Sequence, residues 1–140
     1  MRYLILGAAL GLAACGLAGA QDARPKLVFP LACEIGRTCE VQHYVDRDPG
    51  PGTLDYRCGP HTYDKHDAVD IRVPDLKAQA RGVDVLAAAA GRVVAVRDGV
   101  ADVNVAKAGR ASVQGVECGN RVAINHGGGW LSDYCHLAKG

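Results

Sequence analysis

The chain has 140 residues, a formal net charge of +1, 18 glycines and only 5% aromatic residues. This length suits a single domain, and the balanced charge, with no basic stripe and no acidic tail, argues against capture of nucleic acid. Abundant glycine, alanine and valine favour short strands and tight turns over a helical bundle, so we expect a mainly β fold.

Residues 1–20 have the pattern of a signal peptide. Arg2 precedes an apolar run, residues 4–12, that is too short to span a bilayer, and residues 18–20 (Ala-Gly-Ala) fit the cleavage pattern of secretory signals. Alternatively, residues 12–15 resemble a bacterial lipoprotein cleavage box, with Cys15 as the lipidated residue. Both interpretations predict export to the periplasm or the extracellular space, and only the second tethers the protein to a membrane.

Five of the six cysteines lie beyond the predicted signal, where an oxidising compartment makes disulfides their default state. Cys33 and Cys39 enclose a short loop that could close on itself. Cys118 and Cys135 flank a predicted hairpin, which leaves Cys58 over. No Cys-x-x-Cys pair is present, so a zinc finger or zinc ribbon is not indicated.

Short apolar segments alternate with turn-forming segments along the rest of the chain. The expected strands before the hairpin are residues 27–32, 40–45, 82–87 and 91–99. The first is expected at a sheet edge because Pro30 has no backbone donor. Residues 75–80 could form one or two helical turns. Residues 46–52 and 101–116 are expected to be loops.

The strongest hairpin signal lies at residues 119–137, where two alternating segments flank three glycines. The expected cross-strand pairs are His126–Trp130, Ile124–Ser132, Val122–Tyr134 and Asn120–His136. In this register Cys118 and Cys135 point to opposite faces. A disulfide between them therefore requires a bulge or a strand end near Gly119.

His66 and Asp70 are candidate metal ligands, since an imidazole and a carboxylate both suit zinc. In a straight strand these residues would be about 13 Å apart, too far for one ion. A helix is disfavoured by the β-branched residues that follow and by Pro74. If both bind one metal, the backbone must turn between them. The alternative is a surface histidine in a charged loop.

The order of motifs from Cys58 to Gly140 resembles that of the lysostaphin-like zinc metallopeptidases. The likeness lies in the His66-x-x-x-Asp70 motif, the small and apolar residues 82–96, and the hairpin that ends in Tyr-Cys-His136-Leu. It implies an antiparallel twisted sheet or β-sandwich of the duplicated hybrid motif type, incomplete at the C-terminus. Residues 21–57 would be a Cys-containing N-terminal extension, as in exported proteobacterial members, and residues 58–140 the first part of the peptidase domain.

The resemblance also implies roles for single residues. His66 and Asp70 would bind Zn²⁺, His136 would be the active-site histidine that orients water or stabilises the oxyanion, and His126 would be a structural neighbour. Two departures stand out. Ala68 replaces a usual glycine, and the His-x-His motif that supplies the third ligand would lie further along than Gly140. His61 or His43 could replace that ligand only weakly.

The implied activity is hydrolysis of the peptide cross-links of bacterial cell-wall peptidoglycan by a zinc metalloendopeptidase. The rival hypothesis is a non-catalytic periplasmic module that binds peptidoglycan or activates another wall hydrolase. A third possibility, a purely structural lipoprotein, depends on Cys15 alone.

Overall fold

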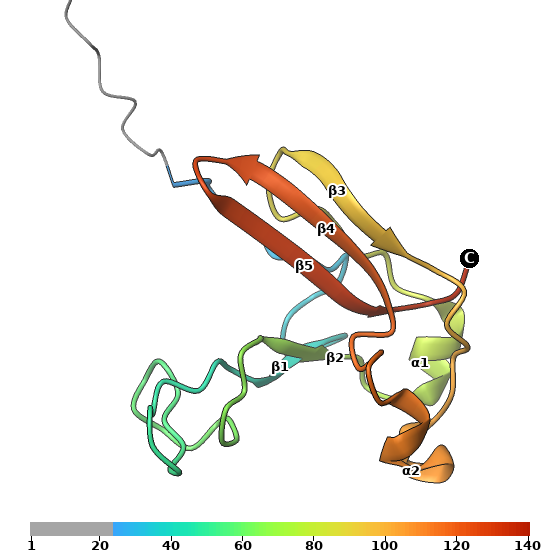
Figure 1. Ribbon diagram of the computed structural model, residues 1–140, viewed down its shortest axis with the longest axis horizontal. Helices are drawn as coiled ribbons and strands as arrows, with labels where there is room; N and C mark the ends of the chain where they lie inside the picture. Colours follow the sequence, from blue (N-terminus) through green and yellow to red (C-terminus); the bar gives the residue numbers. More distant parts are fainter. Residues whose placement is uncertain (1–23) are drawn as a thin grey trace, which may run out of the picture.

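The computed structural model describes residues 24–140 (Figure 1). The predicted signal peptide, residues 1–20, and Cys15 lie outside the described residues. Within them the fold is mainly β, as expected, with two small antiparallel sheets and a few short helices. The elements are β1 (Glu40–His43), β2 (Asp70–Arg72), α1 (Leu76–Arg81), β3 (Arg92–Arg97), α2 (Val105–Ala108), the 3-10 helix η1 (Arg110–Val113), β4 (Asn120–Gly127) and β5 (Trp130–Leu137).

The smaller sheet joins β1 to β2, so the expected N-terminal extension and the expected peptidase segment share one sheet. Val41 lies opposite Ile71. The register then shifts, and His43 becomes the partner of Asp70. A bulge of this kind bends a strand and re-aims the side chain that follows it. Here it directs His43 toward one of the two candidate metal ligands.

The larger sheet has the order β3-β4-β5 and forms the twisted layer above the small sheet in Figure 1. The predicted pairs Ile124–Ser132 and Val122–Tyr134 are confirmed, whereas the predicted pairs at both ends of the hairpin are wrong. Trp130 pairs with Gly127 and not with His126. The remaining two glycines, with φ of 54° and 80°, form a tight turn whose twist matches that of the strands.

At the opposite end of the hairpin, Asn120 pairs with Leu137 across a second register shift. This irregularity permits the Cys118–Cys135 disulfide, whose Cα atoms are 4.8 Å apart. Gly119 next to it has a φ of 57°. The expectation that this bridge needs a bulge or a strand end is therefore confirmed.

The second disulfide joins Cys33 to Cys39. Among residues 24–140, Cys58, the cysteine that the sequence leaves over, is exposed and forms no disulfide. Two disulfides are typical of proteins that fold in an oxidising, extracytoplasmic compartment. Among residues 24–140, no helix is long and apolar enough to cross a membrane.

Two predicted strands are absent from the described structure. Residues 27–32 and 82–87 contact each other through a single bridge, Leu31 to Val85, and a few further backbone hydrogen bonds. Pro30 accepts one of these bonds but has no N–H to continue a ladder. The predicted loop 101–116 contains the short helical turns α2 and η1. The predicted helical turn at residues 75–80 is confirmed as α1, capped by the side chain of Asp75.

The apolar core is thin. Its buried members in the described chain are Cys39, Ala78, Ala88, Ala123 and Ile124. Ile124 is the largest, and it lies on β4, the central strand of the larger sheet. Because little apolar surface is buried among residues 24–140, we expect the two disulfides to contribute substantially to stability.

Candidate metal centre

Two backbone turns bring His66 close to Asp70: one immediately precedes His66, and the other lies between His66 and Asp70. His66 donates its backbone N–H to the Tyr63 carbonyl at 3.0 Å, and Lys65 within this turn has a φ of 62°. The chain then bends at Ala68, which is not among the residues with positive φ. Alanine therefore stands at this position, where the resembled family usually has glycine, without left-handed strain. The result is a distance of 3.3 Å between His66 Nε2 and Asp70 Oδ1.

The imidazole of His66 is held from several sides. It is buried, with 5% of its surface exposed, and it stacks on the Tyr63 ring with 4.2 Å between centroids. Its Nδ1 lies 2.9 Å from the Tyr44 carbonyl oxygen, which also accepts the Thr62 hydroxyl at 2.6 Å. These contacts fix both the ring plane and the direction in which Nε2 points.

The neighbouring loop is anchored by Asp46. Its backbone N–H donates to the His66 carbonyl at 2.7 Å, and its Oδ2 accepts the Lys65 N–H at 2.9 Å. The backbone N–H of Leu54 and then that of Asp48 hold the pKa of the Asp46 carboxyl below its usual value. Asp46 therefore ties the loop after β1 to the turn that carries His66.

The hydrogen bond to Tyr44 determines where the proton of His66 lies. A carbonyl oxygen can only accept, so Nδ1 carries the hydrogen and the Nε2 of a neutral ring presents a lone pair. That lone pair faces a carboxylate oxygen of Asp70 at 3.3 Å. Two acceptors at this distance repel each other unless a cation lies between them, either a proton on Nε2 or a metal ion.

The same distance fits a zinc ion. Nitrogen and oxygen ligands bind tetrahedral zinc at about 2.0–2.2 Å, which places two ligand atoms on one ion about 3.3 Å apart. A carbonyl that accepts from the distal ring nitrogen is also the usual outer contact of a metal-binding histidine. His66 and Asp70 could therefore hold zinc together, with Tyr44 as the outer partner of His66.

His43 contacts the other oxygen of Asp70. Its Nδ1 lies 3.1 Å from Asp70 Oδ2, and its ring packs edge-on against those of Tyr63 and His66. His61 is exposed, and its ring lies 6.3 Å from that of His43. The carboxylate of Asp70 is thus shared between two histidines, one at each oxygen.

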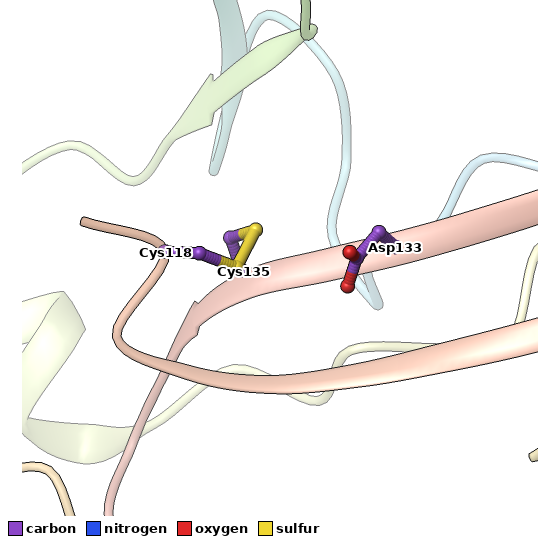
Figure 2. A group of neighbouring side chains, drawn as sticks. All are labelled: Cys118, Asp133 and Cys135. Carbon is purple, nitrogen blue, oxygen red and sulfur yellow. A yellow bond between two sulfur atoms is a disulfide. The ribbon is translucent and has the colours of Figure 1, made fainter. Parts of the chain in front are cut away.

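A second group of potential ligands is not a metal site. Cys118, Asp133 and Cys135 place ligand atoms within 4.8 Å of one another (Figure 2). The two sulfurs form a disulfide, so neither is available as a thiolate. Asp133 is paired with Arg121 at 3.1 Å.

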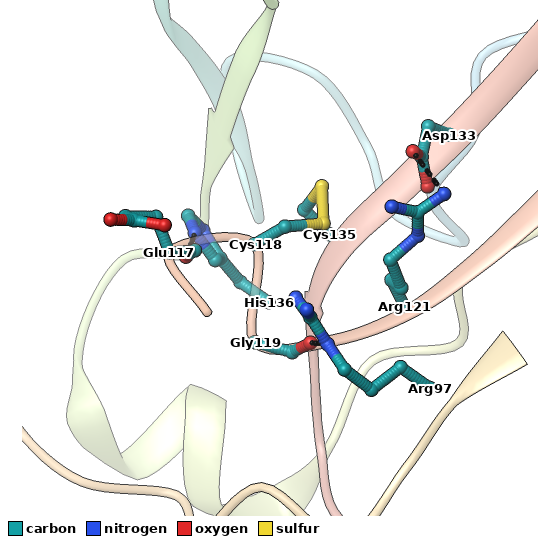
Figure 3. The surroundings of a disulfide bond; sticks show 8 residues. All are labelled: Arg97, Glu117, Cys118, Gly119, Arg121, Asp133, Cys135 and His136. Carbon is teal, nitrogen blue, oxygen red and sulfur yellow. Dashed lines mark hydrogen bonds and ion pairs between the residues drawn. A yellow bond between two sulfur atoms is a disulfide. The ribbon is translucent and has the colours of Figure 1, made fainter. Parts of the chain in front are cut away.

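His136, the predicted catalytic histidine, has its hydrogen-bond contacts elsewhere among the described residues. It is exposed, has a φ of 59°, and its Nε2 lies 3.0 Å from the Glu117 carbonyl oxygen (Figure 3). Within residues 24–140 no hydrogen bond or ion pair joins it to His66 or Asp70. The structure therefore brings the two predicted zinc ligands into contact. The side chain of the predicted catalytic histidine contacts the Glu117 carbonyl instead of either ligand.

His126 has structural contacts. Its Nδ1 lies 2.9 Å from the Ala90 carbonyl, and its Nε2 lies 2.8 Å from the Ser132 hydroxyl, which in turn donates to the Tyr134 hydroxyl at 3.0 Å. The Tyr134 hydroxyl also accepts the Ala88 N–H at 2.7 Å. This chain of hydrogen bonds ties the β4-β5 hairpin to the segment before β3.

Sequence reasoning missed Tyr63 and the Tyr44 carbonyl. The position of Tyr63 three residues before His66, next to turn-forming residues, was a usable signal for an aromatic contact within one turn. The contact of Tyr44 is made by its backbone and has no signal in the side chain. Burial, and after it the charge of Asp70, raises the pKa of the Tyr63 hydroxyl above its ordinary value.

Asp55 organises the loop next to this centre, and this predicts an acid-sensitive loop. Its carboxylate accepts the backbone N–H groups of Gly59, Arg57 and His61, which hold its pKa below the usual value. A lowered folded-state pKa stabilises the loop above the unfolded value, about 3.9, and the effect is lost as pH falls through the folded value. We expect protease cleavage of residues 55–61 to increase below about pH 4.

An Asp55→Asn variant is the matched control for this loop. It keeps the shape of the side chain but cannot titrate, so its cleavage by an acid-tolerant protease should no longer depend on pH in this range. Equal pH dependence in the two proteins would show that Asp55 does not cause the effect.

Comparison of the chain with known protein families, with curated proteins and with solved structures found no match in any of the three.

Proposed function

We propose that this protein is a zinc metalloendopeptidase that hydrolyses peptide cross-links of bacterial peptidoglycan, with the lysostaphin-like fold that its motifs resemble. One observation carries the proposal. His66 Nε2, which Tyr44 leaves without a hydrogen, faces Asp70 Oδ1 at 3.3 Å, the separation of two ligands on one tetrahedral zinc. The two residues are also those that the sequence motif assigns as ligands.

We assign the following roles to residues of this chain. His66 and Asp70 hold the ion, while Tyr44 and Asp46 fix the His66 ring and its turn. A bound zinc ion polarises a carbonyl and lowers the pKa of bound water to about 7. Since the Glu117 carbonyl accepts from His136 Nε2, a neutral His136 keeps a lone pair on Nδ1 that could take up a proton.

A catalytic zinc centre ordinarily has three protein ligands. The third ligand of the resembled family belongs to a His-x-His motif, which residues 1–140 do not contain. We therefore expect these 140 residues to bind zinc weakly and to turn over slowly. The same observation favours the second candidate function, a non-catalytic module that binds peptidoglycan or activates another wall hydrolase.

Export supports either function, because peptidoglycan lies outside the cytoplasm. The two disulfides fit folding in that compartment, and the signal-like residues 1–20 predict the route. The formal net charge of +1 gives no reason to expect electrostatic capture of a polyanion.

Digestion of purified peptidoglycan separates the two candidates. We expect the zinc-loaded protein to release free amino groups from cross-linked peptides, detected by mass spectrometry of the soluble fragments. His66→Ala should reduce release to background, and His61→Ala, which changes an exposed neighbour, should not. If His66→Ala instead stimulates a wall amidase as well as the unmodified protein does, the non-catalytic module is correct.

A further inference from the structure

The bulge in β1 places His43 directly across the small sheet from Asp70, with 3.1 Å between Nδ1 and Oδ2. We propose that His43 is a positioning residue for metal binding, which donates its Nδ1–H to Asp70 Oδ2 and thereby aims Oδ1 at the ion held with His66. This inference rests on the proposed function, since it concerns the same metal centre.

The two histidines on Asp70 differ in where their protons can lie. His66 has its hydrogen committed to Tyr44, so its contact with Oδ1 needs a cation. The ring of His43 makes no other hydrogen bond within residues 24–140, so its hydrogen is free to lie on Nδ1. An N–H donor at 3.1 Å from a carboxylate oxygen is an ordinary hydrogen bond and needs no metal. The geometry therefore assigns His66 as the ligand and His43 as the donor.

Asp70 needs such a partner. It stands at the first position of β2, its side chain is 37% exposed, and among the described residues His43 and His66 are the only side chains on its carboxylate. Without His43 the carboxylate could rotate away from His66 into solvent. Ligating carboxylates are commonly held by outer hydrogen bonds for this reason, and loss of such a bond lowers metal affinity about 10–100-fold.

Neighbouring aromatic rings and the strand pairing orient the His43 ring toward Asp70. Its ring packs edge-on against Tyr63 at 5.3 Å and against His66 at 5.8 Å. At the other end of the two strands, Glu40 and Arg72 form an ion pair that fixes the register of β1 against β2. The pairing of β1 with β2 therefore holds His43 opposite Asp70.

Two substitutions test the hydrogen bond separately from the packing. His43→Phe keeps an aromatic ring for the edge contacts but has no N–H. His43→Asn has an amide N–H that can reach the same oxygen. We expect zinc affinity, measured by competition with a chromogenic chelator, to fall about 10–100-fold in His43→Phe and to stay within about threefold in His43→Asn. The visible spectrum of bound Co²⁺ should keep its shape in His43→Asn, because the ligand set is unchanged.

The other outcomes overturn the proposal. If both variants lose affinity equally and the Co²⁺ spectrum of His43→Asn changes, His43 is itself a ligand. If His43→Phe binds zinc as tightly as the unmodified protein, the contact with Asp70 has no role in binding. Thermal unfolding of each variant identifies any loss of fold. Undiminished zinc binding in His66→Ala would reject the metal site itself, which separates failure of the proposed function from failure of the His43 role.

Discussion

Replacing His66 by alanine is expected to lower zinc affinity by more than about 100-fold, because the loss of outer contacts alone costs about 10–100-fold. The change removes the Nε2 atom that faces Asp70 Oδ1 at 3.3 Å and leaves the carboxylate with one histidine partner. Chelator competition at constant pH measures the effect in the unmodified protein and in the variant.

His66 is buried, so its loss could also disturb the fold. Asp70→Asn is therefore the second variant, since it preserves the shape of a half-buried side chain while removing its charge; it should lose affinity to a similar degree. His61→Ala serves as the control because His61 is exposed and its affinity effect should stay below about threefold. Zinc binding that survives both His66→Ala and Asp70→Asn would place the metal elsewhere.

Gly91→Ala is expected to destabilise the larger sheet by about 1–3 kcal/mol, the usual cost of overpacking a close contact. A Cβ atom at Gly91 would lie 2.6 Å from the Asn125 carbonyl oxygen and 2.6 Å from Ile124 Cγ2. One neighbour is backbone in the central strand β4, and the other is the largest buried core side chain. Neither can move without disturbing the β3-β4 pairing.

Urea denaturation followed by circular dichroism measures this loss, and the midpoint should fall. Gly50→Ala is the matched control, because a Cβ there meets only a side-chain oxygen of Asp48, at 3.1 Å. Since the apolar core is thin, a loss of this size is a large part of the stability of a small domain. An unchanged midpoint in Gly91→Ala would mean that the start of β3 does not approach β4 this closely.

The middle of the β4-β5 hairpin could be predicted because alternation of side chains fixes which residues face each other once the turn is located. Val122 opposite Tyr134 follows from that period of two. The ends could not be predicted in the same way. The glycine turn has two residues and not three, and the register of the hairpin shifts near both ends. The shift near Asn120 also permits the Cys118–Cys135 disulfide. These shifts depend on backbone twist, which the side-chain pattern does not encode.

The metal centre was predictable in part. Chemistry alone required a turn between His66 and Asp70, and the bend at Ala68 provides it. The contribution of His43 was not predictable, because it depends on the pairing of two residues that are 27 positions apart in the sequence and on one bulge that sets the register. The separate contacts of His136 with the Glu117 carbonyl likewise depend on the conformation at the end of β5.

The central claim is that His66 and Asp70 bind one metal ion, and a zinc-soaked crystal measured at the zinc absorption edge tests it directly. We predict an anomalous peak between His66 Nε2 and Asp70 Oδ1, within bonding distance of both, with His43 still hydrogen-bonded to Asp70 Oδ2. Zinc bound elsewhere on the chain, or an ion-free pair in which His66 Nε2 donates a proton directly to Asp70 at saturating zinc, would contradict this account.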